Sequence, residues 1–229
     1  MVRPMPTIAA LIFDMDGTMV DSMPWHAQSW VAFTRRYGME VDLPDLMRRT
    51  NGRNGLECMR EIFQRDMPDE EARALIHEKE VIYRNLFAPV FTEVQGFRAF
   101  AAHARTRGLK VGIGTAGDQD NIAFVLQGLA MPEPPQVIVG GDEGLPGKPD
   151  PAIFLEAARR LGVDPGGCIV FEDSPFGIEA AGRAGMRAVA ICSSHSAQQL
   201  AGPHVLAHVP DYTELLHSKF LENLHVAPA

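Results

Sequence analysis

The sequence predicts an α/β fold: a doubly wound parallel sheet with an α-helical domain inserted after its first strand. Short apolar runs alternate with helical stretches along most of the chain, which is the order produced when helices connect parallel strands. The runs are almost wholly apolar, as strands buried on both faces should be. Between residues 23 and 93 the alternation stops and only helical patterns occur.

Five apolar runs are predicted to be the strands of the sheet. Each run is short, and helical stretches lie between successive runs, so the runs should form one parallel sheet. The predicted strands cover residues 7–13, 109–114, 135–140, 167–171 and 187–192.

Two of the connecting helices carry clear boundary signals. Before the fourth strand, Asp150 is predicted to be the N-cap, Pro151 the first helical residue and Gly162 the C-cap. After the fourth strand, Ser174 and Pro175 are predicted to open the next helix.

Residues 23–93 are predicted to form a helical domain that interrupts a sheet domain made of residues 1–22 and 94–229. A crossover between parallel strands is normally much shorter than this segment. Because the insertion follows the first strand directly, it is placed to cover the end of that strand. Its four helical patterns cover residues 24–37, 44–50, 55–64 and 68–87.

Composition favours a packed protein and does not argue against a small phosphorylated ligand. The chain has 229 residues, of which 46% are hydrophobic and 22% charged. Its net charge of −8 argues against binding to nucleic acid or to an anionic membrane. The cysteines form no CxxC pair, and no signal peptide or membrane-length apolar run is evident. We therefore expect a cytoplasmic protein that is a monomer or a weak homo-oligomer.

Two aspartates one residue apart, Asp14 and Asp16, follow the first predicted strand. Carboxylates about 4 Å apart repel each other by roughly 4 kcal/mol at an effective dielectric constant of about 20, so a cation should lie near them. Ligands of open α/β sheets bind at the carboxyl ends of the strands. The residues expected to meet the aspartates there are Thr115, Lys148, Glu172 and Asp173.

This set of residues favours Mg²⁺-dependent phosphoryl transfer, because oxygen ligands suit Mg²⁺. Asp14 would attack phosphorus to form an acyl phosphate, and Asp16 would act as general acid and base. Thr115 would donate a hydrogen bond to a phosphate oxygen, and Lys148 would offset the phosphate charge. The expected metal ligands are Asp14, Asp16, Glu172 and Asp173.

The same residues resemble the haloacid dehalogenase-like phosphohydrolases. FDMDGTMVDS (13–22) is similar to the family's first motif, Thr115 to its second, Lys148 in GKPDP to its third and FEDSPFGIEAAGRAGM (171–186) to its fourth. The resemblance covers nearly the whole chain and is greatest to the β-phosphoglucomutase-like proteins. It implies a Rossmann-like core, an inserted helical cap, obligatory Mg²⁺ and an aspartyl-phosphate intermediate. Asp16, which the dehalogenases themselves lack at the matching position, favours phosphoryl transfer.

The resemblance also implies four substrate contacts: His26, Arg53, Lys79 and Ala116. Lys79 falls on an apolar helical stripe, where a bare charge would be costly, so an anionic ligand is expected nearby. Other interpretations stay open: His26 as a packed helix residue, Arg53 as an exposed loop charge and Lys79 as a side chain that extends to solvent. Trp30 is expected in the core.

Two further patterns are given less weight. GIGTAG (112–117) matches the dinucleotide-binding fingerprint, but it follows the second strand instead of opening the first βαβ unit. SSHS (193–196) has no nucleophile elbow around it and is predicted to be a surface loop.

We therefore expect a Mg²⁺-dependent phosphomonoester hydrolase that acts on a small phosphorylated metabolite, such as a sugar phosphate. A phosphomutase of the β-phosphoglucomutase type would use the same Asp14 chemistry. The segment GTAGDQDN departs from the mutase pattern at Gly117, Asp118 and Gln119, which disfavours that alternative. A non-enzymatic phospho-acceptor domain is the alternative from another class.

Overall fold

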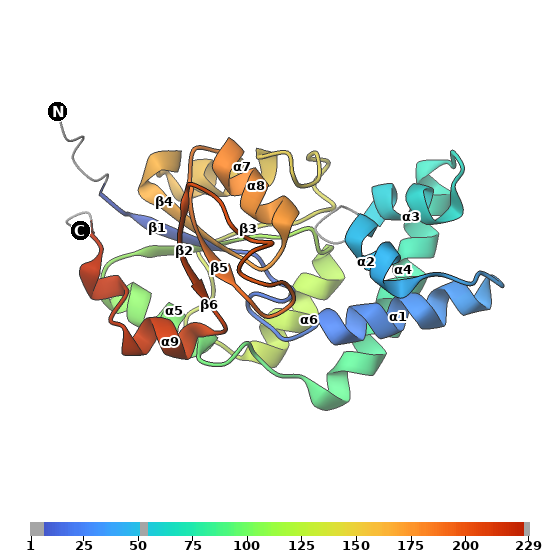
Figure 1. Cartoon of the computed structure of the whole chain (residues 1–229), viewed down its shortest axis with the longest axis horizontal. Helices are drawn as coiled ribbons and strands as arrows, with labels where there is room; N and C mark the ends of the chain where they lie inside the picture. Colours follow the sequence, from blue (N-terminus) through green and yellow to red (C-terminus); the bar gives the residue numbers. More distant parts are fainter. Residues whose placement is uncertain (1–6, 51–54, 227–229) are drawn as a thin grey trace.

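A computed structural model describes residues 7–50 and 55–226 of the chain, so Arg53 lies outside the described residues. Within them, six strands form one parallel sheet in the order β3-β2-β1-β4-β5-β6 (Figure 1). The predicted doubly wound parallel sheet is confirmed. The strands are β1 (Ala10–Phe13), β2 (Lys110–Gly114), β3 (Val137–Val139), β4 (Cys168–Glu172), β5 (Arg187–Ile191) and β6 (Val205–Val209).

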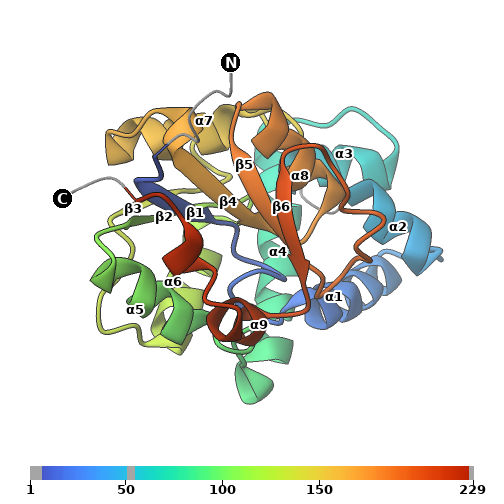
Figure 2. The ribbon, with the colours of Figure 1, turned by 60° about the vertical axis from the view of Figure 1, so that its left-hand side comes forward.

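Helices cover both faces of the sheet because side chains along each strand alternate between the faces (Figure 2). In β1, Leu11 and Phe13 pack with α5, α6 and α9, whereas Ala10 and Ile12 pack with α7 and α8. All four of these side chains are fully buried. The bounds of these helices are α5 (Phe97–Thr106), α6 (Gln119–Leu129), α7 (Ala152–Leu161), α8 (Pro175–Arg183) and α9 (Tyr212–His217).

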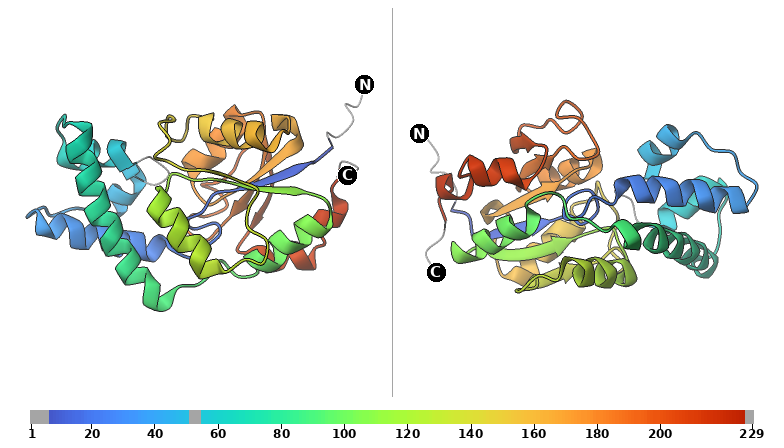
Figure 3. Two further views of the ribbon diagram at one scale, coloured as in Figure 1. Left: turned by 180° about the vertical axis from the view of Figure 1, so that it is seen from behind. Right: turned by 90° about the horizontal axis from the view of Figure 1, so that it is seen from below.

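Four helices between β1 and β2 stand beside the sheet, at the carboxyl ends of its strands (Figures 1 and 3). They pack around an apolar cluster of their own that includes Trp30, Phe33 and Met59. Trp30 is therefore a core residue, as predicted. The helices are α1 (Met23–Arg36), α2 (Leu43–Thr50), α3 (Gly55–Phe63) and α4 (Asp69–Phe87), and the chain returns to the sheet through the short helix η1 (Ala88–Val90).

Helix ends lie close to their predicted positions, with one correction. The predictions of Asp150 as the N-cap of α7 and of Pro151 as its first helical residue are wrong by one position, because the N-cap is Pro151 and the helix begins at Ala152. Asp150 still serves the helix end, since its Oδ1 accepts a hydrogen bond from the backbone N–H of Ala152 at 2.9 Å. Gly162 is the C-cap in the left-handed conformation, and Ser174 is the N-cap of α8, as predicted.

Three elements lie beyond the last predicted strand: β6, α9 and the short helix η3 (Leu221–Asn223). β6 is an edge strand, and it pairs in parallel with β5. Val209 is buried, whereas Val205 and Ala207 are partly buried and Leu206 and His208 are exposed. Within residues 7–50 and 55–226, none of the helices has the length and apolar character needed to cross a membrane.

Candidate active site

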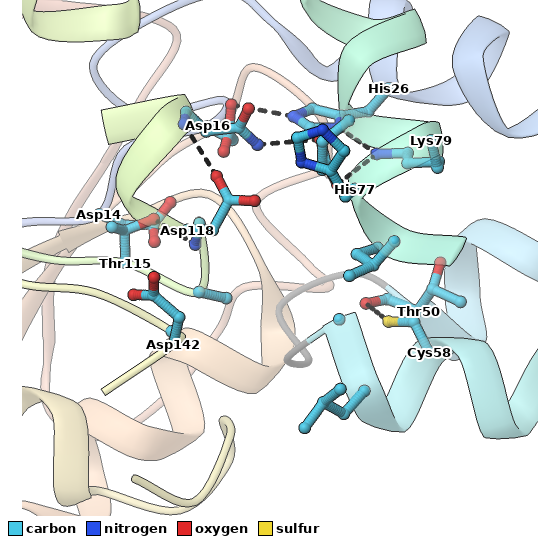
Figure 4. A pocket seen from close by; sticks show the side chains of 18 of the residues that line it. Asp14, Asp16, His26, Thr50, Cys58, His77, Lys79, Thr115, Asp118 and Asp142 are labelled. Carbon is cyan, nitrogen blue, oxygen red and sulfur yellow. Dashed lines mark hydrogen bonds and ion pairs between the residues drawn. The ribbon is translucent and has the colours of Figure 1, made fainter. Parts of the chain in front are cut away.

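A cavity of about 740 Å³ opens at the carboxyl ends of the strands, between the sheet and helices α1–α4 (Figure 4). The loops after β1, β2, β3 and β4 line one side of it. Residues of α1, α3 and α4 line the other side. The cavity therefore lies at the switch between the two halves of the sheet, where the chain leaves β1 and later returns to β2 and β4.

Three carboxylates meet at the sheet side of this cavity. Asp14 follows β1, Glu172 ends β4 and Asp173 follows it, and β1 pairs directly with β4. One carboxylate oxygen of each lies within 4.8 Å of the others, and all three residues are buried. Lys148 is buried beside them, and its Nζ donates to Asp14 Oδ1 at 2.5 Å and to Glu172 Oε1 at 2.7 Å.

The charges in this cluster are unbalanced. Burial raises the pKa of Asp14 to about 8, against the opposing effect of Lys148. Burial, Glu172 and Asp14 together raise the pKa of Asp173 well above its ordinary range. Burial alone would lower the pKa of Lys148, but Asp14 and Glu172 raise it, so the ammonium stays charged. If all three carboxylates were ionised, one ammonium among them would leave an excess of negative charge, and this repulsion contributes to the raised pKa values of Asp14 and Asp173.

These residues fit a magnesium ion. The donor set consists of carboxylate oxygens, which Mg²⁺ prefers, and a divalent cation would compensate the negative charge that Lys148 leaves unpaired. Asp14, Glu172 and Asp173 are the side chains placed to hold it.

The turn after β1 depends on Gly17. This residue has a positive φ of 73°, and an added Cβ would lie 2.2 Å from Oδ2 of Asp173. A larger residue at position 17 would therefore displace the Asp173 carboxylate, which lies close to this turn.

Asp16 points away from the three carboxylates and toward the inserted helices. Its Oδ1 accepts hydrogen bonds from Ser22 Oγ at 2.7 Å and Tyr83 Oη at 3.2 Å, and it lies 3.0 Å from His26 Nε2. Burial alone would raise the pKa of Asp16, but His26 and Ser22 lower it to about 2. The Asp16 side chain thus lies beside the cavity but outside the cluster of Asp14, Glu172 and Asp173, and its predicted metal-ligand and acid–base roles stay predictions.

His26 connects Asp16 to Lys79. The Nζ of Lys79 donates to His26 Nδ1 at 2.7 Å, so the ring hydrogen is assigned to Nε2, which faces Asp16. The His26 ring stacks on Tyr83 with ring centroids 3.7 Å apart. Lys79 also donates to Glu80 Oε1 at 2.9 Å and lies over the Trp30 ring. The anion expected near Lys79 is therefore supplied, in part, by the chain itself.

The loops after β2 and β3 complete the sheet side of the cavity. Thr115 is buried, and its Oγ1 accepts a hydrogen bond from Gly117 N–H at 3.0 Å. Ala116, Asp118 and Asp142 also line the cavity. Asp118 is the N-cap of α6, and burial raises its pKa. Thr115 thus lies beside Asp14 at the carboxyl ends of the strands, as predicted (Figure 4), and Ala116 lines the same cavity.

A segment that sequence reasoning set aside contacts the carboxylate cluster. The loop after β5 was predicted to be a surface loop, and Ser193 and Ser194 are indeed exposed. However, Ser194 Oγ donates a hydrogen bond to Asp173 Oδ2, and Ser193 Oγ donates one to the carbonyl oxygen of Gly17. The one available signal was position, because this loop also follows the carboxyl end of a strand.

Comparisons with known proteins agree with this architecture. A model of the haloacid dehalogenase-like hydrolases matches residues 8–185. A fructose-1-phosphate phosphatase of Escherichia coli is 32% identical over 187 residues, which are 79% of this chain and 95% of that protein. A β-phosphoglucomutase of Bacillus subtilis is 29% identical over 222 residues, which are 92% of this chain and 95% of that protein.

Solved structures share the same fold. A crystal structure of β-phosphoglucomutase from Clostridium difficile superposes with a TM-score of 0.81 at 24% identity, covering 94% of this chain and 96% of that one. A hydrolase from Pseudomonas syringae gives a TM-score of 0.81 at 24% identity, covering 93% and 98%. At this level of identity the likeness establishes the fold.

Proposed function

The chain belongs to the haloacid dehalogenase-like hydrolases, and within this family we propose that it is a Mg²⁺-dependent phosphatase of a small phosphorylated metabolite. The observation that carries the proposal is the buried cluster of Asp14, Glu172, Asp173 and Lys148, with Asp16 beside it at the edge of the cavity. Burying three carboxylates with only one ammonium costs folding free energy if no ligand binds there. These groups are a suitable arrangement for a divalent cation and a phosphoryl group.

Asp14 is the proposed nucleophile. Lys148 holds its Oδ1, which leaves Oδ2 to attack phosphorus. The new bond joins Oδ2 to phosphorus while the ester oxygen leaves with the electron pair of the broken bond. A water then attacks the acyl phosphate, which releases inorganic phosphate and restores the Asp14 carboxylate.

Asp16 is the proposed acid and base. It would give a proton to the leaving oxygen in the first step and take one from the attacking water in the second. Its contact with His26 Nε2 at 3.0 Å places a proton donor next to its carboxylate. The low pKa of Asp16 favours the ionised form, which is the form that accepts the proton from water in the second step. For the first step, Asp16 would take up a proton from solvent when the substrate binds and pass that proton to the leaving oxygen.

Asp14, Glu172 and Asp173 would hold Mg²⁺, which would supply positive charge against the phosphate oxygens when bound. Lys148 adds a fixed positive charge, and Thr115 is placed to donate its hydroxyl hydrogen to a phosphate oxygen. These groups act on the charge that develops in the transition state.

We propose that residues 23–93 act as a cap over this site and that His26, Lys79 and Ala116 contact the substrate. All three line the cavity. Relatives that include the fructose-1-phosphate phosphatase and a phosphorylated carbohydrates phosphatase of Thermotoga maritima favour a sugar phosphate as the substrate.

Hydrolysis is preferred over phosphomutase chemistry because of two acidic residues. A mutase must hold a bisphosphate, whose second phosphate would lie in the part of the cavity away from Asp14. Asp118 and Glu80 line that cavity, and Glu80 is ion-paired with Lys79. Their carboxylates would repel a second phosphate, or keep Lys79 from binding it.

The test is a screen of phosphorylated metabolites with Mg²⁺, scored by released phosphate. We expect turnover of sugar monophosphates, and Asp14→Asn should lower kcat by about 10⁴-fold or more while the circular dichroism spectrum is unchanged. β-Glucose 1-phosphate supplied with a bisphosphate primer should yield free phosphate. Formation of glucose 6-phosphate would establish the mutase, and a stable acyl phosphate without turnover would establish a phospho-acceptor.

A further inference from the structure

The loop that follows β5, residues 193–195, contacts both segments that build the carboxylate cluster. Ser194 Oγ donates to Asp173 Oδ2 and lies 3.2 Å from the Asp173 carbonyl oxygen. His195 Nδ1 lies 2.9 Å from the same carbonyl oxygen and 2.8 Å from Ser194 Oγ. Ser193 Oγ donates to the carbonyl oxygen of Gly17. The loop thereby joins the end of β4 to the turn after β1.

In this loop, donors and acceptors can be assigned for the hydrogen bonds of Ser194. The carboxylate of Asp173 can only accept, so Ser194 uses its hydroxyl hydrogen for Oδ2. The lone pairs of Ser194 Oγ then remain for the N–H of His195 Nδ1, which is shared with the carbonyl oxygen of Asp173. A donor that itself accepts a hydrogen bond is polarised and bonds more strongly to its acceptor.

Ser194 is exposed, whereas the carboxylate that it contacts is buried. An exposed serine hydroxyl can bond to water instead, so Ser194 gains little from this hydrogen bond. The buried Asp173 carboxylate gains more, because a buried acceptor without a donor is costly. Among the described residues, Ser194 is the side chain that donates a hydrogen bond to Asp173. Gly17 packs against the same oxygen, because a Cβ added at Gly17 would lie 2.2 Å from Asp173 Oδ2. Ser194 and Gly17 therefore both restrict the orientation of the carboxylate.

We propose that Ser194 is a positioning residue for the magnesium site: it fixes the orientation of Asp173, with Ser193 and His195 holding the loop against the site. The inference rests on the metal site of the proposed function. Groups that orient a metal ligand without touching the metal commonly change metal affinity by about 10- to 100-fold when they are removed. Because Ser194 does not contact phosphorus or the leaving group, its loss should act on metal affinity more than on the chemical step.

The test is the Mg²⁺ affinity of the substrate-free protein, measured by isothermal titration calorimetry. We expect Ser194→Ala to raise the Kd for Mg²⁺ by about 10-fold. At saturating Mg²⁺, kcat should stay within about threefold of the wild-type value. Ser194→Thr keeps the hydroxyl and should retain most of the affinity. Ser196→Ala is the matched control, because Ser196 Oγ bonds to Gln199 instead of Asp173.

Three results would overturn the proposal: a wild-type protein that does not bind Mg²⁺, a Ser194→Ala protein with wild-type affinity, or an equal loss in Ser194→Ala and Ser196→Ala. The experiment also separates this proposal from the proposed function. A wild-type protein that binds Mg²⁺ but releases no phosphate from any substrate contradicts the phosphatase, and the Kd of Ser194→Ala still decides the role of Ser194.

Discussion

At the scale of single residues, two carboxylates one residue apart have opposite properties. The pKa of Asp14 is raised to about 8, and that of Asp16 is lowered to about 2. Asp14 faces buried carboxylates, whereas Asp16 faces His26, Ser22 and Tyr83. A nucleophile and an acid–base group with separate environments can thus share a three-residue segment.

The low pKa of Asp16 predicts a specific pH dependence of stability. The folded pKa is about 2 and the unfolded value is about 4, so ionisation of Asp16 stabilises the fold by about 2 kcal/mol above pH 5. This contribution is lost as the pH falls through 4 toward 2. We expect Asp16→Asn to lower the free energy of unfolding by about 2 kcal/mol at pH 7 and by about half of that at pH 3. Urea unfolding of the metal-free proteins at both pH values measures this, and an equal difference at both would contradict it.

Lys79 shows what a sequence can and cannot predict about one residue. Its place on an apolar stripe predicted a nearby anion, and Glu80 Oε1 lies 2.9 Å from its Nζ. Neighbours in a helix do not normally face each other, so the pairing of Lys79 with the adjacent Glu80 was not predictable from their spacing. It arises because both side chains are buried between α4, α1 and α6.

At the scale of elements, α8 begins directly against the end of β4. An added Cβ at Gly177 would lie 1.7 Å from Glu172 Oε1, and Glu172 is held by Lys148 and by the N–H of Ser174. We therefore expect Gly177→Ala to displace Glu172 and to lower the free energy of unfolding by about 1–3 kcal/mol. It should also raise the Kd for Mg²⁺. Gly166→Ala is the control, because an added Cβ there meets no atom within 4 Å; equal effects of the two substitutions would contradict the prediction.

Helix α4 is bonded to α6 through Asn121. Asn121 Nδ2 donates to Glu80 Oε2 at 2.9 Å, and Asn121 Oδ1 accepts from an Arg84 N–H at 2.7 Å. Asn121→Ala leaves a buried Glu80 oxygen without this donor, so we expect a loss of about 1–3 kcal/mol in the free energy of unfolding. Gln127→Ala, on an exposed position of the same helix, should change it by less than about 0.5 kcal/mol. Urea unfolding at pH 7 measures both, and a similar value for the two variants would refute the bridging role of Asn121.

Elements with local signals were predictable, and those that depend on distant pairing were not. Gly162 and Ser174 mark helix ends by their own backbone and hydrogen-bonding properties. β6 has no comparable signal, because an edge strand is only partly buried and is defined by its pairing with β5. The error at Asp150 also comes from a boundary that local signals do not decide. Asp150 and Pro151 both suit the start of a helix, and the loop before them determines which one is the N-cap.

At the scale of the whole molecule, the sheet gathers residues from distant motifs at one edge. Asp14, Lys148 and Glu172 were predicted to meet because each follows a parallel strand, and their contacts agree with this. The contacts of Ser194 with Asp173 and of His26 with Asp16 depend on how loops and helices pack in space. No spacing rule encodes them, so the sequence predicted the centre of the site better than its surroundings.

Protons and Mg²⁺ compete for the buried carboxylates of the cluster, which couples magnesium binding to pH. In the metal-free protein, folded Asp14 keeps its proton up to about pH 8, whereas an unfolded aspartate loses it near pH 4. The stability that this proton provides is present below pH 4 and is lost as the pH rises through 8. Magnesium needs the ionised carboxylate, so its binding displaces the proton and should become tighter over the same pH range.

We therefore expect Mg²⁺ to stabilise the protein more at pH 8.5 than at pH 6. With Mg²⁺ at about 100 times its Kd at pH 8.5, the stabilisation is about 2.7 kcal/mol, or roughly 5–10 °C in Tm for a chain of this size. At pH 6 the same Mg²⁺ concentration should raise Tm by much less, because most Asp14 side chains are protonated. Thermal unfolding at constant ionic strength measures the shift. Asp14→Asn should remove most of its pH dependence, and an equal shift at both pH values would contradict the coupling.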